Sequence, residues 1–241
     1  MLDNCCDFST FCIQKSGDTM PQTELVIFDL DGTLVDTATD VHLCLNLALQ
    51  EMNLPLISLE TAKKAIGPGP KEFVKYVLAD RVDLAEEFVQ IYRPFYMKHC
   101  ADNAELYDGI IELLRELQAN RIKMAVATNK THRATEIVLR ALAIDSCFDV
   151  VVARDQVAQP KPAPDMLLHI CERLNILPKN ALMLGDTDND ILAANAAEIR
   201  SCLALWGFSE HFEALKKIST FSAEYPLQVL DIIESEIVQH V

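Results

Sequence analysis

The stretch that decides the fold of this chain is DLDGTLVD, residues 29–36. It directly follows the apolar run LVIF at residues 25–28, which is typical of a buried β-strand. Asp29 and Asp31 therefore stand at the end of a buried strand. A carboxylate is costly in such a place unless it is paired, hydrogen-bonded or bound to a metal. The two aspartates thus predict a functional site at this strand end.

Length and charge limit what the chain does. Its 241 residues are enough for one large domain or two smaller ones, and its formal net charge is −15. This charge argues against a nucleic-acid or anionic-membrane surface, because either would need a basic face. No apolar run approaches the roughly 20 residues that span a bilayer. The charge and the short apolar runs together mean that neither nucleic acid nor a membrane is expected as a partner.

The N-terminus and the cysteines favour a cytoplasmic protein. The first residues lack the basic start and apolar core of a signal peptide. The eight cysteines are scattered without a Cys-x-x-Cys pair, which argues against a zinc site and favours reduced, buried thiols. Residues 1–22 show no clear period and are interpreted as an N-terminal tail. Within it, Met20 is a candidate for the true start, because the first strand begins a few residues later.

Residues 37–105 are predicted to be helical throughout. Val41, Leu45 and Met52 share one helical face, and further helical patterns follow at about residues 59–66, 71–78 and 83–98. The sequence Gly-Pro-Gly-Pro that begins at residue 67 is a stiff turn between two of these patterns. No strand is expected in this stretch, so we interpret it as a helical insertion after the first strand.

Strands and helices alternate from residue 106 to the end. Apolar runs predict strands at about residues 122–127, 148–152, 181–184 and 202–205, with helical patterns between and after them. This alternation argues for a parallel sheet with helices on both faces. The predicted fold class is therefore α/β, a doubly wound parallel sheet. Residues 23–36 and 106–241 form its core domain, and residues 37–105 form the inserted helical domain.

The motifs that carry chemistry stand at the ends of predicted strands. Asp29 and Asp31 follow the first strand, Thr-Asn-Lys at residues 128–130 follows the second, and GDTDND at residues 185–190 follows a later one. Lys161 lies between two prolines in a loop that would restrict its position. Ligands bind beyond the carboxyl ends of the strands in such sheets, so we expect these segments to converge on one edge.

Crowded carboxylates at that edge predict a metal and a phosphate site. Asp29, Asp31, Asp186 and Asp190 would repel one another, and a divalent cation would remove that penalty. All-oxygen ligands favour Mg²⁺, which together with Lys161 would attract a phosphate dianion. A carboxylate can attack phosphorus and form an aspartyl-phosphate. A second carboxyl group can protonate the leaving alcohol and then activate water.

Structural explanations compete with this interpretation. The two aspartates of the first motif could cap a turn, and Thr128 could bond the backbone at its strand end. Lys161 could be a solvated loop residue, and Gly67 could belong to a plain turn instead of a substrate-facing loop. The presence of all the motifs in register favours the functional interpretation.

A calcium-binding loop at residues 186–197 is excluded. Ile191 occupies the place of the glycine that such a loop requires, and Ala197 occupies the place of its glutamate. Asp188 is therefore better interpreted as a helix cap or as a residue that supports the site indirectly.

Together the motifs resemble those of the haloacid dehalogenase superfamily. The resemblance rests on DLDGTLVD, on the strand that ends in Ala-Thr-Asn, on the lysine in the Pro-Lys-Pro loop and on GDTDND. It covers about residues 24–235 in the expected order and implies a Rossmann-like core. The helical insertion looks like the small helical cap domain of that superfamily. The closest pattern is that of the phosphoglycolate phosphatase-like group.

The resemblance implies roles for the four aspartates. Asp29 is the nucleophile and also a Mg²⁺ ligand. Asp31 is the general acid and base and offers its backbone carbonyl to the metal. Asp186 binds the metal directly, while Asp190 binds it or its water shell.

The resemblance also implies which residues meet the substrate. Thr128 and Lys161 bind the phosphoryl group, with Asn129 beside them, and Gly67 of the insertion is a further candidate. The chain departs from the family where Ala-Ala-Glu at residues 196–198 replaces a common turn glycine. This departure concerns the local turn and not the chemistry.

The implied function is a Mg²⁺-dependent phosphomonoester hydrolase that forms an aspartyl-phosphate. Its substrate would be a small phosphorylated metabolite, with phosphoglycolate the leading candidate, and the protein would be a monomer or homodimer. An aspartate at position 31 points to phosphatases and phosphomutases, because relatives that cleave carbon–halogen bonds or pump ions lack it. Two alternatives stay open, a phosphoglucomutase-type phosphotransferase and a catalytically weak regulatory protein.

Overall fold

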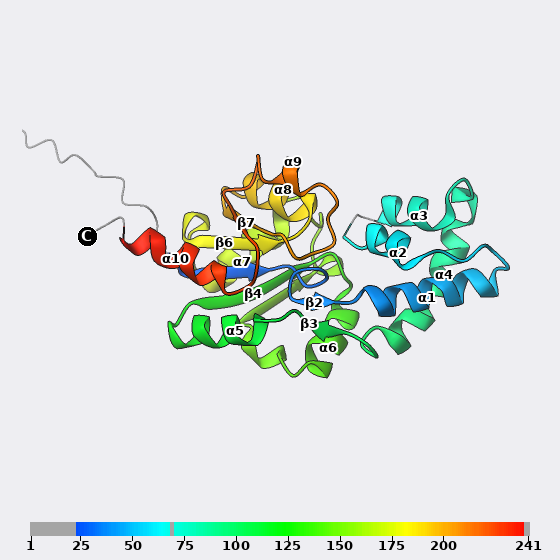
Figure 1. Ribbon diagram of the computed structural model, residues 1–241, viewed down its shortest axis with the longest axis horizontal. Helices are drawn as coiled ribbons and strands as arrows, with labels where there is room; N and C mark the ends of the chain where they lie inside the picture. Colours follow the sequence, from blue (N-terminus) through cyan, green and yellow to red (C-terminus); the bar gives the residue numbers. More distant parts are fainter. Residues whose placement is uncertain (1–22, 68–69, 239–241) are drawn as a thin grey trace, which may run out of the picture.

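The computed structural model describes residues 23–67 and 70–238, and it forms two lobes (Figure 1). The predicted tail, with the proposed start at Met20, lies outside these residues. One lobe contains a six-stranded parallel sheet in the order β5-β4-β1-β6-β7-β8. Its strands are β1 (Leu25–Phe28), β4 (Lys123–Thr128), β5 (Val150–Ala153), β6 (Ala181–Gly185), β7 (Arg200–Ala204) and β8 (Phe221–Ala223).

Helices cover both faces of this sheet because its central strands are apolar on both sides. Successive side chains of a strand point to opposite faces. Val26 and Phe28 belong to the hydrophobic core on one face, and Leu25 and Ile27 belong to the core on the other. The first face is covered by α5 (Ile110–Ala119), α6 (His132–Ala141) and α10 (Gln228–Val238), and the second by α7 (Asp165–Leu174) and α8 (Asp188–Ala196). The predicted doubly wound α/β class is confirmed.

The register of the central strands brings distant segments to one edge. β1 lies between β4 and β6, and Phe28 at its end pairs with Val126 of β4 and Leu184 of β6. All three strands run in the same direction, so their carboxyl ends lie side by side. The strand order reverses at β1, and ligands of such sheets bind at this kind of switch point.

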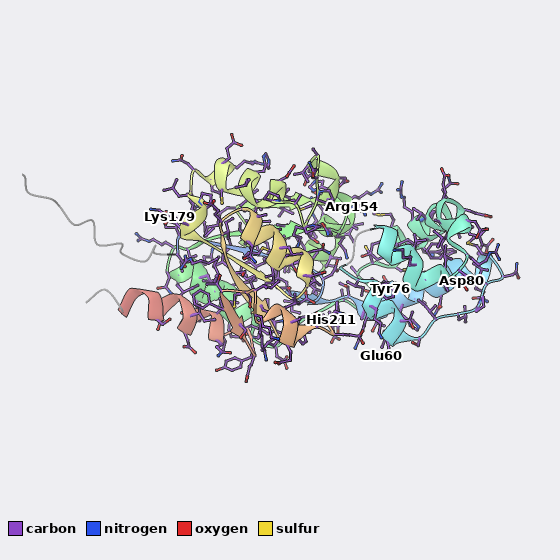
Figure 2. The ribbon with its side chains drawn as sticks, turned by 90° about the horizontal axis from the view of Figure 1, so that it is seen from above. Glu60, Tyr76, Asp80, Arg154, Lys179 and His211 are labelled. Atoms are coloured by element: carbon purple, nitrogen blue, oxygen red, sulfur yellow. The ribbon has the colours of Figure 1, made fainter. Side chains whose placement is uncertain are left out.

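The second lobe, which we call the helical lobe, consists of α1 to α4. These are α1 (Ala38–Glu51), α2 (Leu59–Ala65), α3 (Pro70–Leu78) and α4 (Ala85–His99), with a 3₁₀ turn at Val82–Leu84. They enclose a core of their own around Leu45 and the fully buried Phe88. Asp80 lies on this lobe, whereas Lys179 lies on the sheet lobe well away from it (Figure 2). The four predicted helical patterns are all helices in the structure.

A small antiparallel pair joins the two chain segments that cross between the lobes. β2 (Val35–Asp36) pairs with β3 (Glu105–Leu106), so that Val35 faces Leu106. No strand was expected at Glu105, because a strand of two residues is too short to show alternation. The sequence also did not predict α9 (Phe212–Leu215) or β8. Nor did it predict the 3₁₀ turns at Asp145–Cys147, Arg154–Gln156 and Pro178–Asn180.

Five cysteines lie within the described residues. The cysteines there are free, and all except the half-buried Cys147 are buried. No helix in the described part of the chain combines the length and the apolar character needed to cross a bilayer.

Candidate active site

Asp29 lies at the carboxyl end of β1, between the two neighbouring strands. Its backbone N–H donates to the carbonyl of Leu184 at 2.9 Å and extends the β1–β6 ladder by one residue. Its side-chain Oδ1 accepts a hydrogen bond of 2.7 Å from the N–H of Leu30. The side chain is buried at the point where β1 ends, so its charge depends on what the rest of the site supplies.

Asp186 and Asp190 lie beside Asp29, and both are completely buried. Asp186 follows β6 and accepts hydrogen bonds from the hydroxyl of Thr33 at 3.0 Å and the N–H of Phe208 at 2.8 Å. Asp190 lies in the first turn of α8. Its Oδ2 accepts from the N–H of Thr187 at 3.0 Å and from the hydroxyl of Thr187 at 2.7 Å.

The cap of α8 differs from the sequence-based expectation. Thr187 is the N-cap residue, and Asp188 is already the first residue of the helix. Asp188 is exposed, and its Oδ1 accepts from the neighbouring N–H of Asn189 at 3.0 Å. Thr187 takes the N-cap position because its N–H and its hydroxyl both bind the carboxylate of Asp190 three residues later.

A glycine allows the DLDGTLVD loop to close over Asp186. Gly32 has a φ of +88°, and a Cβ there would collide with the carboxylate of Asp186 and lie 2.8 Å from the ring of Phe208. Any other residue would therefore displace the carboxylate of Asp186 as well as strain the backbone.

Lys161 reaches the carboxylates from the loop before α7. Its Nζ lies 3.0 Å from Oδ1 of Asp29 and 2.5 Å from Oδ1 of Asp190, and its side chain is buried. The carbonyl of Lys161 accepts a hydrogen bond of 3.0 Å from Nδ2 of Asn129, which fastens the loop to the end of β4. The solvated-loop interpretation of this lysine is therefore wrong.

Burial perturbs the protonation of the cluster. Burial raises the pKa of Asp29 to about 7; Asp190 adds to the shift, and Lys161 opposes it. Burial, followed by the charges of Asp190 and Asp29, raises the pKa of Asp186 well above its usual value. Burial alone would lower the pKa of Lys161, but Asp190 and Asp29 outweigh it and the pKa is raised. One lysine thus does not balance the charge that Asp29, Asp186 and Asp190 would carry together, and the raised pKa values of Asp29 and Asp186 favour their neutral forms.

These residues fit a divalent cation. Oxygen atoms of Asp29, Asp186 and Asp190 all lie within 4.8 Å of one another. The donors are hard carboxylate oxygens, which suit Mg²⁺ or Ca²⁺ better than a softer metal. A cation among them would offset the burial and the mutual repulsion that raise the pKa values of Asp29 and Asp186.

Thr128 and Asn129 lie at the end of β4, next to the cluster. The buried hydroxyl of Thr128 accepts a hydrogen bond of 3.2 Å from the N–H of Lys130, so the strand-end role weighed for it is present. Oδ1 of Asn129 is buried and has no hydrogen-bond partner within the described residues. Such an acceptor costs free energy unless a ligand or water pairs with it.

Asp31 is not part of the cluster of Asp29, Asp186 and Asp190, and its carboxylate is bound by Lys130. Nζ of Lys130 lies 2.6 Å from Oδ1 and 2.8 Å from Oδ2 of Asp31. The hydroxyl of Thr37 donates to the same Oδ1 at 2.7 Å. The segment at residues 128–130 was expected at this edge of the sheet, but no role was predicted for Lys130. Pairing across 99 positions requires the β1–β4 register, which no local pattern reveals.

The helical lobe meets the site through Gly67. Its carbonyl accepts a hydrogen bond of 2.7 Å from Nδ2 of Asn189, and a Cβ on Gly67 would lie 2.8 Å from Cγ2 of Thr187. Gly67 therefore contacts the start of α8, next to the buried Asp190. An ion pair of 3.0 Å between Lys64 and Glu210 links the lobes nearby.

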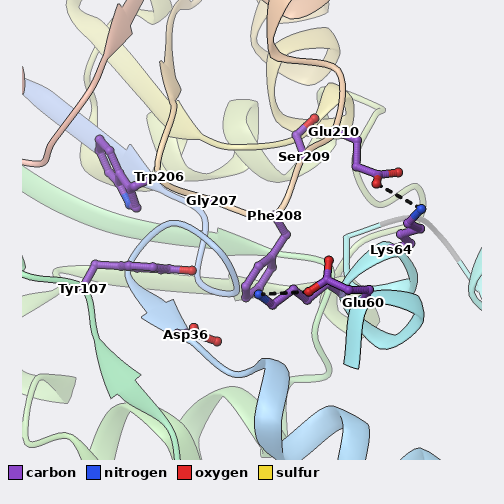
Figure 3. A pocket seen from close by; sticks show the side chains of 10 residues that line it. Asp36, Glu60, Lys64, Tyr107, Trp206, Gly207, Phe208, Ser209 and Glu210 are labelled. Carbon is purple, nitrogen blue, oxygen red and sulfur yellow. Dashed lines mark ion pairs between the residues drawn. The ribbon is translucent and has the colours of Figure 1, made fainter. Parts of the chain in front are cut away.

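A cavity of about 280 Å³ lies between the two lobes beside these contacts (Figure 3). Trp206 and Tyr107 lie at one end of it, and the Lys64–Glu210 ion pair lies at the other. Nε1 of Trp206 donates to the carbonyl of Thr33 at 3.0 Å. The indole thus both packs and faces a cavity near the site.

Known proteins are similar to this chain in sequence and in fold. The sequence profile of the family described as haloacid dehalogenase-like hydrolase matches residues 26–204. A phosphoglycolate phosphatase of Aquifex aeolicus is 32% identical over 215 residues, which are 89% of this chain and 99% of the relative. A phosphoglycolate phosphatase of Nitrosospira multiformis is 36% identical over 191 residues, 77% of this chain and 84% of the relative.

A solved structure agrees with these sequence matches. It is described as a predicted phosphoglycolate phosphatase from Haemophilus somnus, and it superposes with a TM-score of 0.81 at 28% identity. The match covers 88% of this chain and 99% of the other. Both lobes are therefore shared with that protein.

Proposed function

Because the chain belongs to the haloacid dehalogenase-like hydrolase family and is a phosphatase of that family, we propose that it hydrolyses phosphoglycolate through an aspartyl-phosphate on Asp29. The observation that carries the mechanism is the cluster of Asp29, Lys161, Asp186 and Asp190 at the carboxyl edge of the sheet. The names of the relatives from Aquifex aeolicus and Nitrosospira multiformis support the substrate.

The residues of this chain divide the reaction into two steps. In the first, a carboxylate oxygen of Asp29 forms a bond to phosphorus as the bond to the alcohol oxygen breaks, and Asp31 protonates that oxygen. In the second, water attacks phosphorus and gives a proton to Asp31. The bond between phosphorus and Asp29 then breaks and releases inorganic phosphate. Asp31 thus ends each cycle with the proton that it lost.

Cations at the site favour this transfer. Lys161 would bind the phosphoryl oxygens, with Thr128 and Asn129 beside it at the end of β4. Asp29, Asp186 and Asp190, with the backbone carbonyl of Asp31, would hold Mg²⁺. A bound Mg²⁺ would neutralise negative charge on the phosphoryl group during transfer.

The helical lobe would act as the cap over this site. It contacts the start of α8 through Gly67 and encloses the cavity with Lys63 and Lys64 on one wall. A cap in this position excludes bulk water from the aspartyl-phosphate and limits the substrate to small esters. On this basis we propose that residues 37–105 form a separate cap domain, inserted into the core domain of residues 23–36 and 106–241.

Phosphate release from phosphoglycolate and a panel of other phosphomonoesters tests the proposal. We expect turnover with Mg²⁺, loss of turnover in EDTA, and a loss of at least about 1,000-fold in Asp29→Asn. Asp188→Asn is a matched control in the same acidic motif, because its side chain is exposed and binds only a neighbouring N–H among the described residues. That variant should keep native turnover.

Three results would contradict the proposal. Retained turnover in Asp29→Asn would remove the nucleophile. Isomerisation of a sugar phosphate without release of phosphate would establish the mutase alternative. Absence of turnover on every ester, with phosphate or phosphoester binding retained, would establish the regulatory alternative.

A further inference from the structure

We propose that Lys130 is a positioning residue that orients the carboxylate of Asp31 for proton transfer, an inference that rests on the proposed phosphatase function. Lys130 is buried directly after β4, and its Nζ binds both oxygens of Asp31 at 2.6 and 2.8 Å. The ammonium holds both oxygens, and the hydroxyl of Thr37, which donates to Oδ1 alone at 2.7 Å, restricts rotation of the carboxylate plane.

The hydrogen bonds distinguish the two oxygens of Asp31. Oδ1 accepts from both Lys130 and Thr37, so its two lone pairs are occupied. Within the described residues, Oδ2 accepts from Lys130 alone and keeps one free acceptor position. Oδ2 is therefore the atom that we assign to the proton of the attacking water and of the leaving alcohol.

The helical lobe in turn positions Lys130. Nζ of Lys130 lies 5.1 Å from the ring centroid of Tyr96, which belongs to α4. The ring of Tyr96 is stacked on that of Tyr92 with centroids 5.2 Å apart, so the aromatic surface is itself supported by the lobe. A cation over an aromatic face is attracted to it. The lysine thus makes the orientation of Asp31 depend on the placement of α4.

Stability alone does not account for this lysine. Moving an ion pair out of water costs free energy that the attraction between the charges only partly returns. The pair with Asp31 is nevertheless buried on the lysine side and placed beside the candidate nucleophile. Precise orientation of a proton-transferring group is worth about 10- to 100-fold in rate, which gives the pair a functional reason.

The test compares the two chemical steps in Lys130→Met with p-nitrophenyl phosphate. Nitrophenolate leaves with little need for a proton, so only hydrolysis of the aspartyl-phosphate should depend strongly on Asp31. We expect kcat to fall about 10- to 100-fold and KM to fall with it, so that kcat/KM, which reports formation of the aspartyl-phosphate, changes less than about threefold. The rate of the pre-steady-state burst of nitrophenolate should stay within about threefold of native.

Further variants separate positioning from folding. Lys130→Arg retains a two-point donor and should recover part of the steady-state rate. Tyr96→Leu removes the ring and should lower the same step, and Tyr96→Phe should lower it less. Lys123→Met is the matched control, because Lys123 begins the same strand and pairs with Asp149 at 2.7 Å on the protein surface. This control should keep native kinetics.

A structural readout completes the test. In a crystal structure of Lys130→Met, the carboxylate of Asp31 should leave the native orientation or occupy several. An unchanged orientation, or a burst and a steady-state rate that fall in proportion, would overturn the proposal. If the native protein hydrolyses no phosphomonoester, the proposed function fails instead, and the orientation of Asp31 in this variant still decides the role of Lys130.

Discussion

The side-chain amide of Asn189 donates a hydrogen bond of 2.7 Å to the carbonyl oxygen of Gly67. Asn189 belongs to α8, and Gly67 follows α2 in the helical lobe. The next residue after Asn189 is Asp190, whose carboxylate binds Lys161 inside the site. One hydrogen bond thus connects the placement of the helical lobe with the helix that carries part of the carboxylate cluster.

Asn189→Ala should weaken closure of the helical lobe. The lost hydrogen bond is worth about 1 kcal/mol, so we expect kcat/KM to fall about fivefold, mainly through a higher KM. Steady-state kinetics on the best phosphomonoester substrate measure this. Asn195→Ala is the control, because Asn195 lies on the same helix and donates to Ile218 on the surface instead. Equal kinetics in the two variants would show that the Asn189 contact does not contribute to closure.

The stability of the metal-free protein should depend on pH through Asp29. Burial raises the pKa of this residue from 3.8 to about 7, so between these values the folded protein holds a proton that the unfolded chain releases. The contribution of protonated Asp29 to the free energy of unfolding is therefore fully present below about pH 4, and it is lost as the pH rises through 7. We expect Asp29→Asn to be more stable than the native protein in EDTA, by a margin that grows from pH 5 to pH 8.

Mg²⁺ should reverse this difference. The cation requires ionised carboxylates, so its effect on the native Tm should be larger at pH 8 than at pH 5. Calorimetry of the native protein and Asp29→Asn, each with EDTA or with Mg²⁺, measures all four conditions. A native Tm that responds equally to Mg²⁺ at both pH values would contradict the competition between protons and metal.

Glu198→Gly should stabilise the protein. Glu198 has a φ of +56° in the turn between α8 and β7, at the place where the sequence departs from the family pattern. A residue with a Cβ is strained there by about 1 kcal/mol, and glycine removes the strain. Urea unfolding should show this gain. Glu198→Ala keeps the Cβ and should change little, so an equal gain in both variants would assign the effect to the lost carboxylate.

Asp40→Ala should destabilise the connection between the lobes. Asp40 is completely buried at the start of α1, and its carboxylate accepts three hydrogen bonds from Asn103, two from the N–H at 3.0 Å and one from Nδ2 at 2.8 Å. Without the carboxylate, the N–H and the side-chain amide of Asn103 lose their hydrogen-bond acceptor, which should lower the free energy of unfolding by about 2–3 kcal/mol. Asp40→Asn keeps one acceptor and should cost less. A loss below about 0.5 kcal/mol in Asp40→Ala would show that water replaces the carboxylate.

Very short elements were hard to predict from the sequence. The strands of the parallel sheet are apolar runs, and β1, β4 and β6 were expected close to their observed bounds. β2 and β3 are two residues long and depend on each other for their hydrogen bonds. Nothing local distinguishes Val35 or Glu105 from the loops around them, because the pairing itself makes the strand.

The residues of the site also differ in how far local sequence patterns predicted them. Asp29 and Asp186 follow buried strands, so a local pattern was enough to place them at one edge of the sheet. Lys130 and Gly67 depend on partners 99 and 122 positions away. The pairing of Lys130 was therefore not predicted, and Gly67 was left between two interpretations.

The sequence by itself determined which groups stand at the strand ends, because the apolar period and the charge of each motif are local properties. The parallel order of the strands then required their ends to meet. Only the tertiary structure decided which groups pair, because the register and the placement of the helical lobe select among several nearby cations. In the tertiary structure Lys161 pairs with Asp29 and Asp190, and Lys130 pairs with Asp31. Asp29 and Asp31 of DLDGTLVD, two residues apart, thus acquire different environments, one inside the carboxylate cluster and one paired with Lys130.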